Sequence, residues 1–472
     1  SVCILKLSQL NISTTIMKQY SFTDTIFALA TPPGRSALAV IRVSGPRAGY
    51  VAKLFGTALL QPRQAQRRWL KDKNGKLIDD VMMINFIGPH SATGEDVTEI
   101  HCHGSPAVVE DILNHLAATS GFRLAEAGEF TRRALDHDKT DITSAEGLAD
   151  LIDADTSLQR EQAVAQMSGS LRRPVESWRS EIISCLSELE TLIDFADEEL
   201  PTSLETQIKN RIKIIHDDMK ASLSDFHKGQ IIRSGLSVVL AGPVNAGKST
   251  LLNLLARRPA AIVSEIPGTT RDSIEVGIEI AGIPVLVKDT AGWRQTDDPI
   301  EKEGIDRARQ AAEDADVLVF VVDGNQAGWS AELFETVTPD SVPPLLLLNK
   351  SDKGIEVGNV QHITARFSEE DVIYISAKDG AGLSAFERRL EKIIRNLNRS
   401  SSSVTLTRVR HQQAVRQAVE HLQASLCLSA VDQTEFIAEE FRLATSSLSR
   451  ILGQVDIEDV LDHIFSSFCI GK

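Results

Sequence analysis

Short apolar runs alternate with polar, helix-forming stretches along residues 235–396. The runs lie at 237–241, 285–287, 317–322, 345–348 and 372–375. Strands that are apolar throughout are typical of a sheet covered by helices on both faces. The pattern therefore predicts a doubly wound α/β domain over residues 235–396.

Residues 21–138 have a different texture, with short β-rich runs separated by glycine and proline turns. These runs lie at 25–30, 37–43, 81–86 and 97–102. Runs of this kind, bounded by turn residues, are typical of strands. We therefore expect an α+β domain at 21–138, preceded by an N-terminal extension at 1–20 in which Met17 is a plausible alternative start.

Helical periodicity appears on both sides of the α/β domain, at 139–234 and at 397–472. Apolar residues recur there at steps of three and four, which marks one face of a helix; they are Trp178, Ile182, Leu186, Leu189, Ile193, Val415, Val419, Leu422 and Leu426. Neither segment is expected to bury a full core alone. The two segments therefore predict one discontinuous helical domain into which the α/β domain is inserted.

Composition narrows the class of protein. The 472 residues suit about three domains at roughly 150 residues each. With 65 acidic against 50 basic residues, the formal net charge is -15. Because cations that neutralise phosphates supply most non-specific affinity for nucleic acids, RNA binding would need a local basic patch or a basic partner.

The cysteines and the apolar runs indicate the compartment. The five cysteines are scattered and never paired as Cys-x-x-Cys, which argues against a disulfide framework and favours a reducing, cytoplasmic location. The longest apolar runs are far too short to cross a bilayer. Residues 1–20 lack a basic segment followed by a continuous apolar one. We expect no membrane partner.

A phosphate-binding loop follows the first strand of the α/β domain. Residues 242–249 read Gly-Pro-Val-Asn-Ala-Gly-Lys-Ser, which matches G-x-x-x-x-G-K-[ST] between a strand and a helix. In such a loop backbone N–H groups surround the phosphates, Lys248 reaches the β and γ oxygens, and the Ser249 hydroxyl binds Mg²⁺. The predicted phosphate contacts are Asn245, Ala246, Gly247, Lys248, Ser249 and Thr250.

Three further motifs follow strands in a fixed order. Asp-Thr-Ala-Gly at 289–292 offers Asp289 to the Mg²⁺ shell and Gly292 to the γ-phosphate. Asn-Lys-Ser-Asp at 349–352 offers Asp352, whose carboxylate accepts from the guanine N1 and exocyclic amine. Together with Ser-Ala-Lys at 376–378, these motifs resemble those of Ras-like GTPases and favour GTP/GDP over ATP. The predicted contacts are Asp289, Gly292, Asn349, Lys350, Asp352, Ser376, Ala377 and Lys378.

A switch segment, Pro-Gly-Thr-Thr-Arg-Asp at 267–272, lies between the phosphate loop and Asp289. A threonine here can reach Mg²⁺. Thr270 is our Mg²⁺ candidate beside Ser249, although the adjacent Thr269 leaves the assignment between the two open.

The residue that activates water differs from the Ras pattern. Trp293 stands where Ras-like enzymes have a glutamine, and an indole has no acceptor for the proton of the water. Glu301, with Glu303 in reserve, is the candidate substitute. A glutamate in such an acidic stretch is more often a solvated surface charge, so both interpretations stand at this point.

Motifs outside the α/β domain extend a family resemblance over about residues 21–472. They are Ala-Thr-Pro-Pro-Gly-Arg at 30–35, Ile-Arg-Val-Ser-Gly at 41–45, Thr-Gly-Glu-Asp at 93–96, Gly-Glu-Phe-Thr at 128–131, Leu-Ile-Asp-Phe at 192–195 and Phe-Cys-Ile-Gly-Lys at 468–472. The chain resembles the tRNA modification GTPase MnmE (TrmE) family. The resemblance implies a Ras-like G domain inserted in a discontinuous helical domain, preceded by a folate-binding α+β domain that forms a homodimer.

The resemblance also implies partners and a reaction. Family members couple GTP hydrolysis to modification of the wobble uridine of tRNA, at position 5 and of the carboxymethylaminomethyl type, with a FAD-containing MnmG-type partner in a heterotetramer. A 5-formyl- or methylene-tetrahydrofolate would supply the one-carbon unit. Arg42, Glu99 and Lys139 fall in the matching stretches and are the implied folate contacts. Cys469 would lie at the modification site, in a role that stays open.

The same resemblance implies a potassium site. Family members hydrolyse GTP fast when two G domains meet, each with a K⁺ ion, and the ligands would here be Asn245, Ser264, Ile266 and Thr269. Glu301 matches the family's water-activating glutamate. The chain departs from the usual family pattern at Pro243, which is not adjacent to Asn245, at Ser264, where threonine is more common, and at Thr140, where an apolar residue is usual.

Three alternatives compete with this interpretation. A ribosome-assembly GTPase would share the G motifs but need an RNA-binding module, and no basic Gly-x-x-Gly loop of the KH type is present. A folate-dependent one-carbon transferase would use the G domain for regulation only. Glu99, His101 and His103 alternate along a predicted strand and could bind zinc, although strand-end histidines beside a folate contact are the simpler interpretation.

Overall fold

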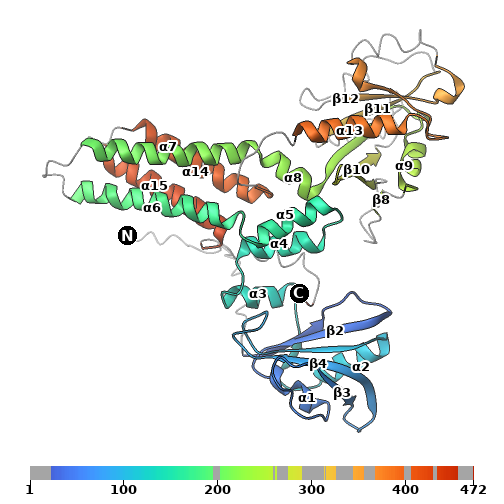
Figure 1. Cartoon of the computed structure of the whole chain (residues 1–472), viewed down its shortest axis with the longest axis vertical. Coiled ribbons are helices and arrows are strands. Elements are labelled where there is room, and N and C mark those ends of the chain that lie inside the picture. Colours follow the sequence, from blue (N-terminus) through green and yellow to red (C-terminus); the bar gives the residue numbers. More distant parts are fainter. Residues whose placement is uncertain are drawn as a thin grey trace, which may run out of the picture. The chain divides into compact units, whose positions relative to one another are not determined.

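The computed structural model, shown in Figure 1, divides into two compact units: the first contains the described residues up to Asp141 together with Gly471, and the second those from Ile142 to Gln454. The residues described are 23–194, 202–258, 261–262, 275–289, 313, 315–325, 344–355, 367–397, 406–428, 433–454 and 471. No helix among them is long and apolar enough to cross a membrane.

The first unit is built on a six-stranded sheet in the order β3-β4-β5-β2-β1-β6. Only β1 and β6 pair in parallel. The strands are β1 (Thr25–Leu29), β2 (Ser36–Ser44), β3 (Gln66–Lys71), β4 (Leu77–Phe86), β5 (Val97–Gly104) and β6 (Phe122–Leu124). With helices on its faces, this mixed sheet confirms the predicted α+β class.

Alternation along the strands decides which side chains enter the core. On β2 and β5, Ile41 and Ile100 are directly paired and fully buried, and they pack with residues of α1 (Val51–Leu54) and α2 (Pro106–Ala117). The residues that precede and follow each of them along its strand point to the opposite face of the sheet. There, α3 (Glu129–Asp136) covers β1 through Phe130.

The helical part of the second unit joins segments from both ends of its sequence. Residues of the predicted apolar stripes, such as Ile182 and Leu422, are fully buried in one common cluster. This confirms the predicted discontinuous helical fold. The helices are α4 (Ile142–Ile152), α5 (Ser157–Met167), α6 (Arg172–Asp194), α7 (Thr202–Ser224), α8 (Phe226–Ser234), α14 (Val409–Cys427) and α15 (Thr434–Leu452).

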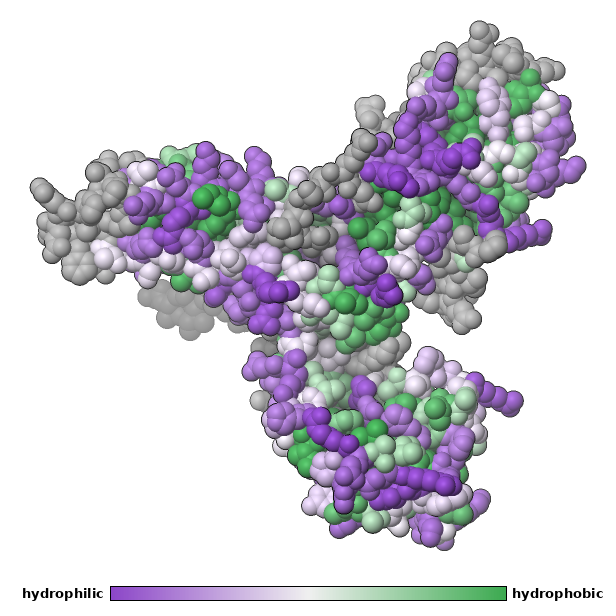
Figure 2. All heavy atoms as spheres, in the orientation of Figure 1, coloured by the Kyte–Doolittle hydropathy of each residue, from purple (hydrophilic) through white to green (hydrophobic). Residues whose placement is uncertain are grey.

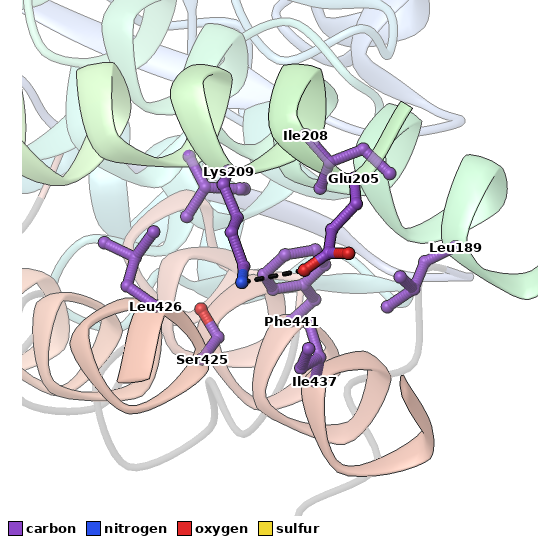
Figure 3. Close-up of a pocket in the computed structure, with 9 residues that line it drawn as sticks. Leu189, Glu205, Ile208, Lys209, Ser425, Leu426, Ile437 and Phe441 are labelled. Atoms are coloured by element: carbon purple, nitrogen blue, oxygen red, sulfur yellow. Dashed lines mark ion pairs between the residues drawn. The ribbon is translucent and has the colours of Figure 1, made fainter. Parts of the chain in front are cut away.

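A small pocket lies among α6, α7, α14 and α15 (Figure 3). The ion pair between Lys209 and Glu205 spans 2.8 Å beside it, and the Ser425 hydroxyl faces the same space. Most of its lining is apolar, so we interpret it as a packing feature of the bundle. The lining residues are Leu189, Glu205, Ile208, Lys209, Ile212, Ser425, Leu426, Ile437 and Phe441.

The second sheet, in the same unit, has the order β13-β12-β11-β7-β10-β9-β8. Its strands are β7 (Leu236–Ala241), β8 (Ala261–Ile262), β9 (Glu275–Ile280), β10 (Ile283–Asp289), β11 (Val317–Asp323), β12 (Pro344–Asn349) and β13 (Val372–Tyr374). β7 and β10 to β13 are parallel to one another, whereas β9 pairs antiparallel with both of its neighbours, β10 and β8.

Both faces of this sheet are covered, as the continuous apolar runs predicted. Along β11, Val319 and Val321 belong to the cluster on one face, while Phe320 and Val322 belong to the cluster on the other. The first cluster also contains residues of α9 (Lys248–Ala256) and α13 (Leu383–Leu397). The doubly wound α/β class is therefore confirmed.

A charged network connects the helices to the start of this sheet. Asp150 on α4 accepts from the Nη2 atom of Arg408 at 2.8 Å and from the Nε atom of Arg233 at 2.9 Å. Arg233 is the second-last residue of α8, and Gly235 then leads directly into β7. The network thus holds the helix that precedes the strand of the phosphate loop.

Candidate guanine-nucleotide site

The phosphate loop connects the end of β7 to the start of α9. Gly242 has a φ of 140°, and a Cβ atom there would lie 2.2 Å from the backbone oxygen of Val321. Only glycine therefore fits between β7 and its neighbour β11. The loop ends at Gly247, which has a φ of 100° and precedes the first turn of α9. Its backbone N–H groups and the helix N-terminus form a site suited to phosphate.

Lys248 lies within this loop rather than in solvent. Its side chain is buried, and its Nζ atom donates to the backbone oxygens of Gly242 at 2.7 Å and Pro243 at 3.2 Å. Burial lowers the pKa of Lys248, an effect that the nearby Asp289 carboxylate partly opposes. Phosphate oxygens at the loop would compensate the buried charge, as the predicted role requires.

Ser249 and Asp289, both predicted to lie beside Mg²⁺, are in direct contact. The Ser249 hydroxyl donates to Oδ2 of Asp289 at 3.0 Å, which brings together two residues 40 positions apart. The other carboxylate oxygen, Oδ1, is buried and has no hydrogen-bond partner among the described residues, and burial raises the pKa of Asp289. A hydroxyl beside an unpartnered carboxylate oxygen fits Mg²⁺, which prefers oxygen ligands and takes few from the protein.

Asn349 joins the phosphate loop to the guanine side. Its Nδ2 atom donates to the backbone oxygen of Ala246 at 2.7 Å, and its Oδ1 atom accepts from the backbone N–H of Ala377 at 2.9 Å. The side chain is 2% exposed. The close approach also excludes a side chain at Gly247, where a Cβ atom would lie 2.1 Å from Nδ2 of Asn349. Three loops are thus fixed by one carboxamide.

Asp352, the predicted guanine contact, lies beside Ser376. The Ser376 hydroxyl donates to one of its oxygens at 3.1 Å, while the Asp352 side chain is exposed and able to accept further bonds. Of the other predicted contacts, Thr250 and Lys378 are exposed beside their loops, and Ala246 is buried.

The structure adds a residue that the motifs did not predict. Asp323, at the end of β11, accepts from Nζ of Lys350 at 2.7 Å, and this ion pair lowers the pKa of Asp323 against the opposing effect of burial. Lys350 has a φ of 64°, so its backbone is held in a conformation that few side chains adopt. In the sequence, the position of Asp323 at the end of an apolar run was the signal that could have indicated this role.

Several predicted site residues lie outside the described part of the chain, so their roles stay predictions. They are the K⁺ candidates Ser264, Ile266 and Thr269, the Mg²⁺ candidate Thr270, the γ-phosphate contact Gly292, the catalytic candidate Glu301 and the modification-site candidate Cys469. Asn245, the fourth K⁺ candidate, is described and has a φ of 66° in the phosphate loop.

In the first unit the structure brings two of the three folate candidates together. Arg42 and Glu99 are directly paired on β2 and β5, and their side chains meet at 2.9 Å, with the guanidinium 5.9 Å from the centre of the Phe130 ring. Both side chains are part-exposed. Lys139 is exposed, and no contact joins it to either residue among the described side chains.

The zinc alternative does not match the side-chain geometry. His101 contacts Glu99 at 3.2 Å, but His103 pairs with Asp79 at 2.8 Å. The three alternating residues therefore do not converge, and the described chain holds no group of three side chains that could bind a metal ion.

Comparisons with known proteins cover nearly the whole chain. The family model described as GTP-binding protein TrmE N-terminus matches residues 25–139, and the MnmE helical domain model matches 142–469. The tRNA modification GTPase MnmE of Maricaulis maris is 46% identical over 95% of this chain and 99% of its own length. The protein of the same name from Caulobacter vibrioides is 43% identical over 95% of this chain and 100% of its own.

Solved structures overlap with the chain less extensively. A structure of Era from Aquifex aeolicus covers 39% of this chain and 66% of its own at 26% identity, with a TM-score of 0.28. A score of this size does not establish a common fold. The family models and the relatives do establish kinship: the chain belongs to the tRNA modification GTPase MnmE family, whose members are GTPases acting in tRNA modification.

Proposed function

We propose that this chain binds GTP with Mg²⁺, hydrolyses it to GDP and phosphate, and uses the cycle to modify the wobble uridine of tRNA. The observation that carries the proposal is the meeting of the phosphate loop, Asp289 and the guanine loops around Asn349. Each of these elements follows a different parallel strand. Their convergence at one sheet edge supports a single nucleotide site there.

The described residues have distinct tasks in this site. Loop N–H groups and Lys248 bind the phosphates, Ser249 and Asp289 hold Mg²⁺, and Asp352 selects guanine through two hydrogen bonds that adenine cannot offer. Asn349 and the Asp323–Lys350 pair keep the guanine loops in place. Mg²⁺, when bound, would supply positive charge next to the phosphate oxygens.

For hydrolysis we propose that Glu301 positions or polarises the attacking water, because Trp293 has no acceptor. The proposed K⁺ ligands are Asn245, Ser264, Ile266 and Thr269, with Thr270 completing the Mg²⁺ shell. K⁺ there would stabilise charge that develops on the phosphate oxygens, as an arginine finger does elsewhere. Pairing of two G domains would complete the site.

The proposal includes the remaining partners. The first unit would form the homodimer and bind 5-formyl- or methylene-tetrahydrofolate through Arg42, Glu99 and Lys139. A FAD-containing MnmG-type partner would join in a heterotetramer in the cytoplasm. Cys469, from the terminal motif, would face the modification site.

Potassium dependence is the first test. At high protein concentration, GTP turnover should be at least tenfold faster in KCl than in matched NaCl, because K⁺ supplies charge stabilisation that Na⁺ does not. Asn245→Ala should lose this difference. Asn245→Gly removes the same carboxamide while permitting the positive φ. It should therefore lose the K⁺ effect as Asn245→Ala does.

Two controls make that outcome decisive. Asn114→Ala, at an exposed position of α2, should keep the full K⁺ effect. GDP affinity of the Asn245 variants should stay within about threefold of the parent, since backbone groups carry the phosphate contacts. Slow turnover of the parent in both salts would contradict the proposal and favour a switch of the ribosome-assembly type that needs an external activator.

Folate binding is tested at the Arg42–Glu99 pair. Glu99→Gln should weaken binding of 5-formyltetrahydrofolate at least tenfold, because a charge-assisted acceptor for the N–H edge of the pterin is lost. Titration calorimetry on the full chain measures the effect. Glu110→Gln on α2, also an exposed carboxylate, should bind as the parent does. Equal affinity of both variants would remove Glu99 from the folate site.

A further inference from the structure

A basic hairpin stands out on this acidic chain. Six of the 14 residues at 63–76 are lysine or arginine and one is acidic, although the whole chain has a formal net charge of -15. The segment contains β3 and the tight turn that leads into β4 in the first unit. Figure 2 shows strongly hydrophilic residues gathered over this part of the sheet.

The acidic residues nearest to the hairpin are already engaged. Asp72 accepts from the backbone N–H groups of Asn74 at 2.9 Å and Lys76 at 2.8 Å, so its carboxylate serves the turn. Asp80 is bound by Arg67 and Asp79 by His103. Local carboxylates are therefore not available to neutralise the other cations.

Five cations consequently remain without a carboxylate partner among the described residues. The three lysines have exposed side chains, and the two arginines bond to neutral oxygens only, Arg63 to the backbone of His90 and Arg68 to Gln66 and the backbone of Arg67. The five are Arg63, Arg68, Lys71, Lys73 and Lys76. Unpaired cations gathered on one hairpin suit a polyanion.

An aromatic platform lies within the same hairpin. Trp69 is 52% exposed on β3, and the guanidinium of Arg67 lies 5.8 Å from the centre of its ring. Exposing an indole to water is unfavourable unless another surface covers it. An exposed indole beside cations is the arrangement on which unpaired nucleic-acid bases stack.

We propose that the β3–β4 hairpin is a tRNA-binding surface, on which the three exposed lysines and Arg63 contact backbone phosphates and Trp69 stacks on an unpaired base. β3 is the edge strand of its sheet, and lysines on such strands also prevent edge-to-edge aggregation. That role explains the lysines but not the exposed indole. The proposal rests on the family's action on tRNA and is independent of the G site.

Salt dependence of binding tests the cations. The full chain with GDP is titrated into a fluorescent, unmodified tRNA transcript at several NaCl concentrations. Lys71→Gln/Lys73→Gln should raise the Kd about tenfold at low salt and reduce the slope of log K against log salt by about 1.5, since each phosphate contact contributes roughly 0.7–0.9. Lys213→Gln/Lys220→Gln, the same charge change at exposed positions of α7, should leave both values unchanged.

Stacking is tested separately at the indole. Trp69→Ala should weaken binding about fivefold or more without changing the salt slope, because stacking on an aromatic side chain releases no counterions. Trp69→Phe should retain part of the affinity. GTP turnover and the melting temperature of all four variants should match the parent, which shows that the fold and the G site are intact.

Three outcomes would overturn the proposal. An unchanged Kd for the hairpin variants would assign the lysines to edge protection alone. An equal loss in the α7 control would show a bulk charge effect. Loss of binding to phosphatidylglycerol vesicles with intact tRNA binding would assign the hairpin to a lipid surface. Since tRNA binding is measured without GTP hydrolysis, failure of the K⁺ proposal would not affect this result.

Discussion

Asp352→Asn should change the nucleotide that the protein accepts. The mutation should weaken GTP binding about 100-fold, because a carboxylate that accepts from two guanine N–H groups becomes a carboxamide that offers a donor to one of them. Binding of xanthosine triphosphate should improve by a similar factor, since the xanthine ring has an oxygen where guanine has its amine. Competition against a fluorescent GDP analogue measures both affinities.

The control for this exchange is Glu369→Gln, an exposed carboxylate in the same domain, which should bind both nucleotides as the parent does. The Ser376 hydroxyl, 3.1 Å from Asp352, can also donate to the oxygen of the new carboxamide, so the loop should keep its geometry. Equal loss of both nucleotides would contradict the assignment and indicate collapse of the guanine loops instead.

The second large effect concerns stability and lies outside the G site. Glu146 on α4 is fully buried, and its carboxylate accepts from Nε of Arg410 at 2.7 Å and from Nε2 of His411 at 2.9 Å. Glu146→Gln should lower the free energy of unfolding by about 3–5 kcal/mol at pH 7, because Arg408 and Arg410, which contact its buried carboxylate, lose their counter-charge. Urea denaturation followed by circular dichroism measures it.

The pH dependence has a defined sign. The paired cations lower the pKa of Glu146 below its ordinary value of 4.5, although burial alone would raise it. The stabilisation is therefore complete above the unfolded pKa and is lost as the pH falls through the folded one. The gap between parent and variant should be constant from pH 7 to about 5 and narrow below 4.5.

His411 acts in the same direction. Burial lowers the pKa of His411 below its ordinary value of 6.5, against the opposing effect of Glu146, so the imidazole binds a proton more readily in the unfolded chain than in the fold. Acid therefore destabilises through both groups. Glu391→Gln, at an exposed pair on α13, should leave the denaturation midpoint unchanged. An equal shift in both variants would contradict a specific role of the network.

Local features were predicted well from the order of residues. The phosphate loop was recognisable because its glycines, Lys248 and Ser249 lie within eight consecutive positions, and a backbone that surrounds phosphate needs those residue types at that spacing. The class of the second sheet followed from its continuous apolar strands, and that of the first from short β-rich runs bounded by glycine and proline turns. Loop motifs and strand patterns each depend on a few consecutive residues, so they can be recognised from the sequence of those residues.

Contacts between distant segments could not be predicted in this way. Glu146 and His411 are 265 positions apart, and nothing near either one indicates the other. Asp323 was missed because a single aspartate after a strand is common, and only its approach to Lys350 distinguishes it. The structure likewise joined Arg42 to Glu99 but not to Lys139, which the family resemblance had placed with them.

The sequence by itself determined the chemistry available to this protein: a guanine-nucleotide site after β7, helical segments on both sides of it, and the residue types of a GTPase. Tertiary structure decided which side chains meet and which charges stay unpaired. The basic hairpin is an example, because five of its six cations lack a carboxylate partner only since Asp72 binds backbone N–H groups of the turn, Asp79 binds His103 and Asp80 binds Arg67. Ion pairs form between side chains that are close in space. Strand register brings those side chains together, and the order of residues alone does not show which ones meet.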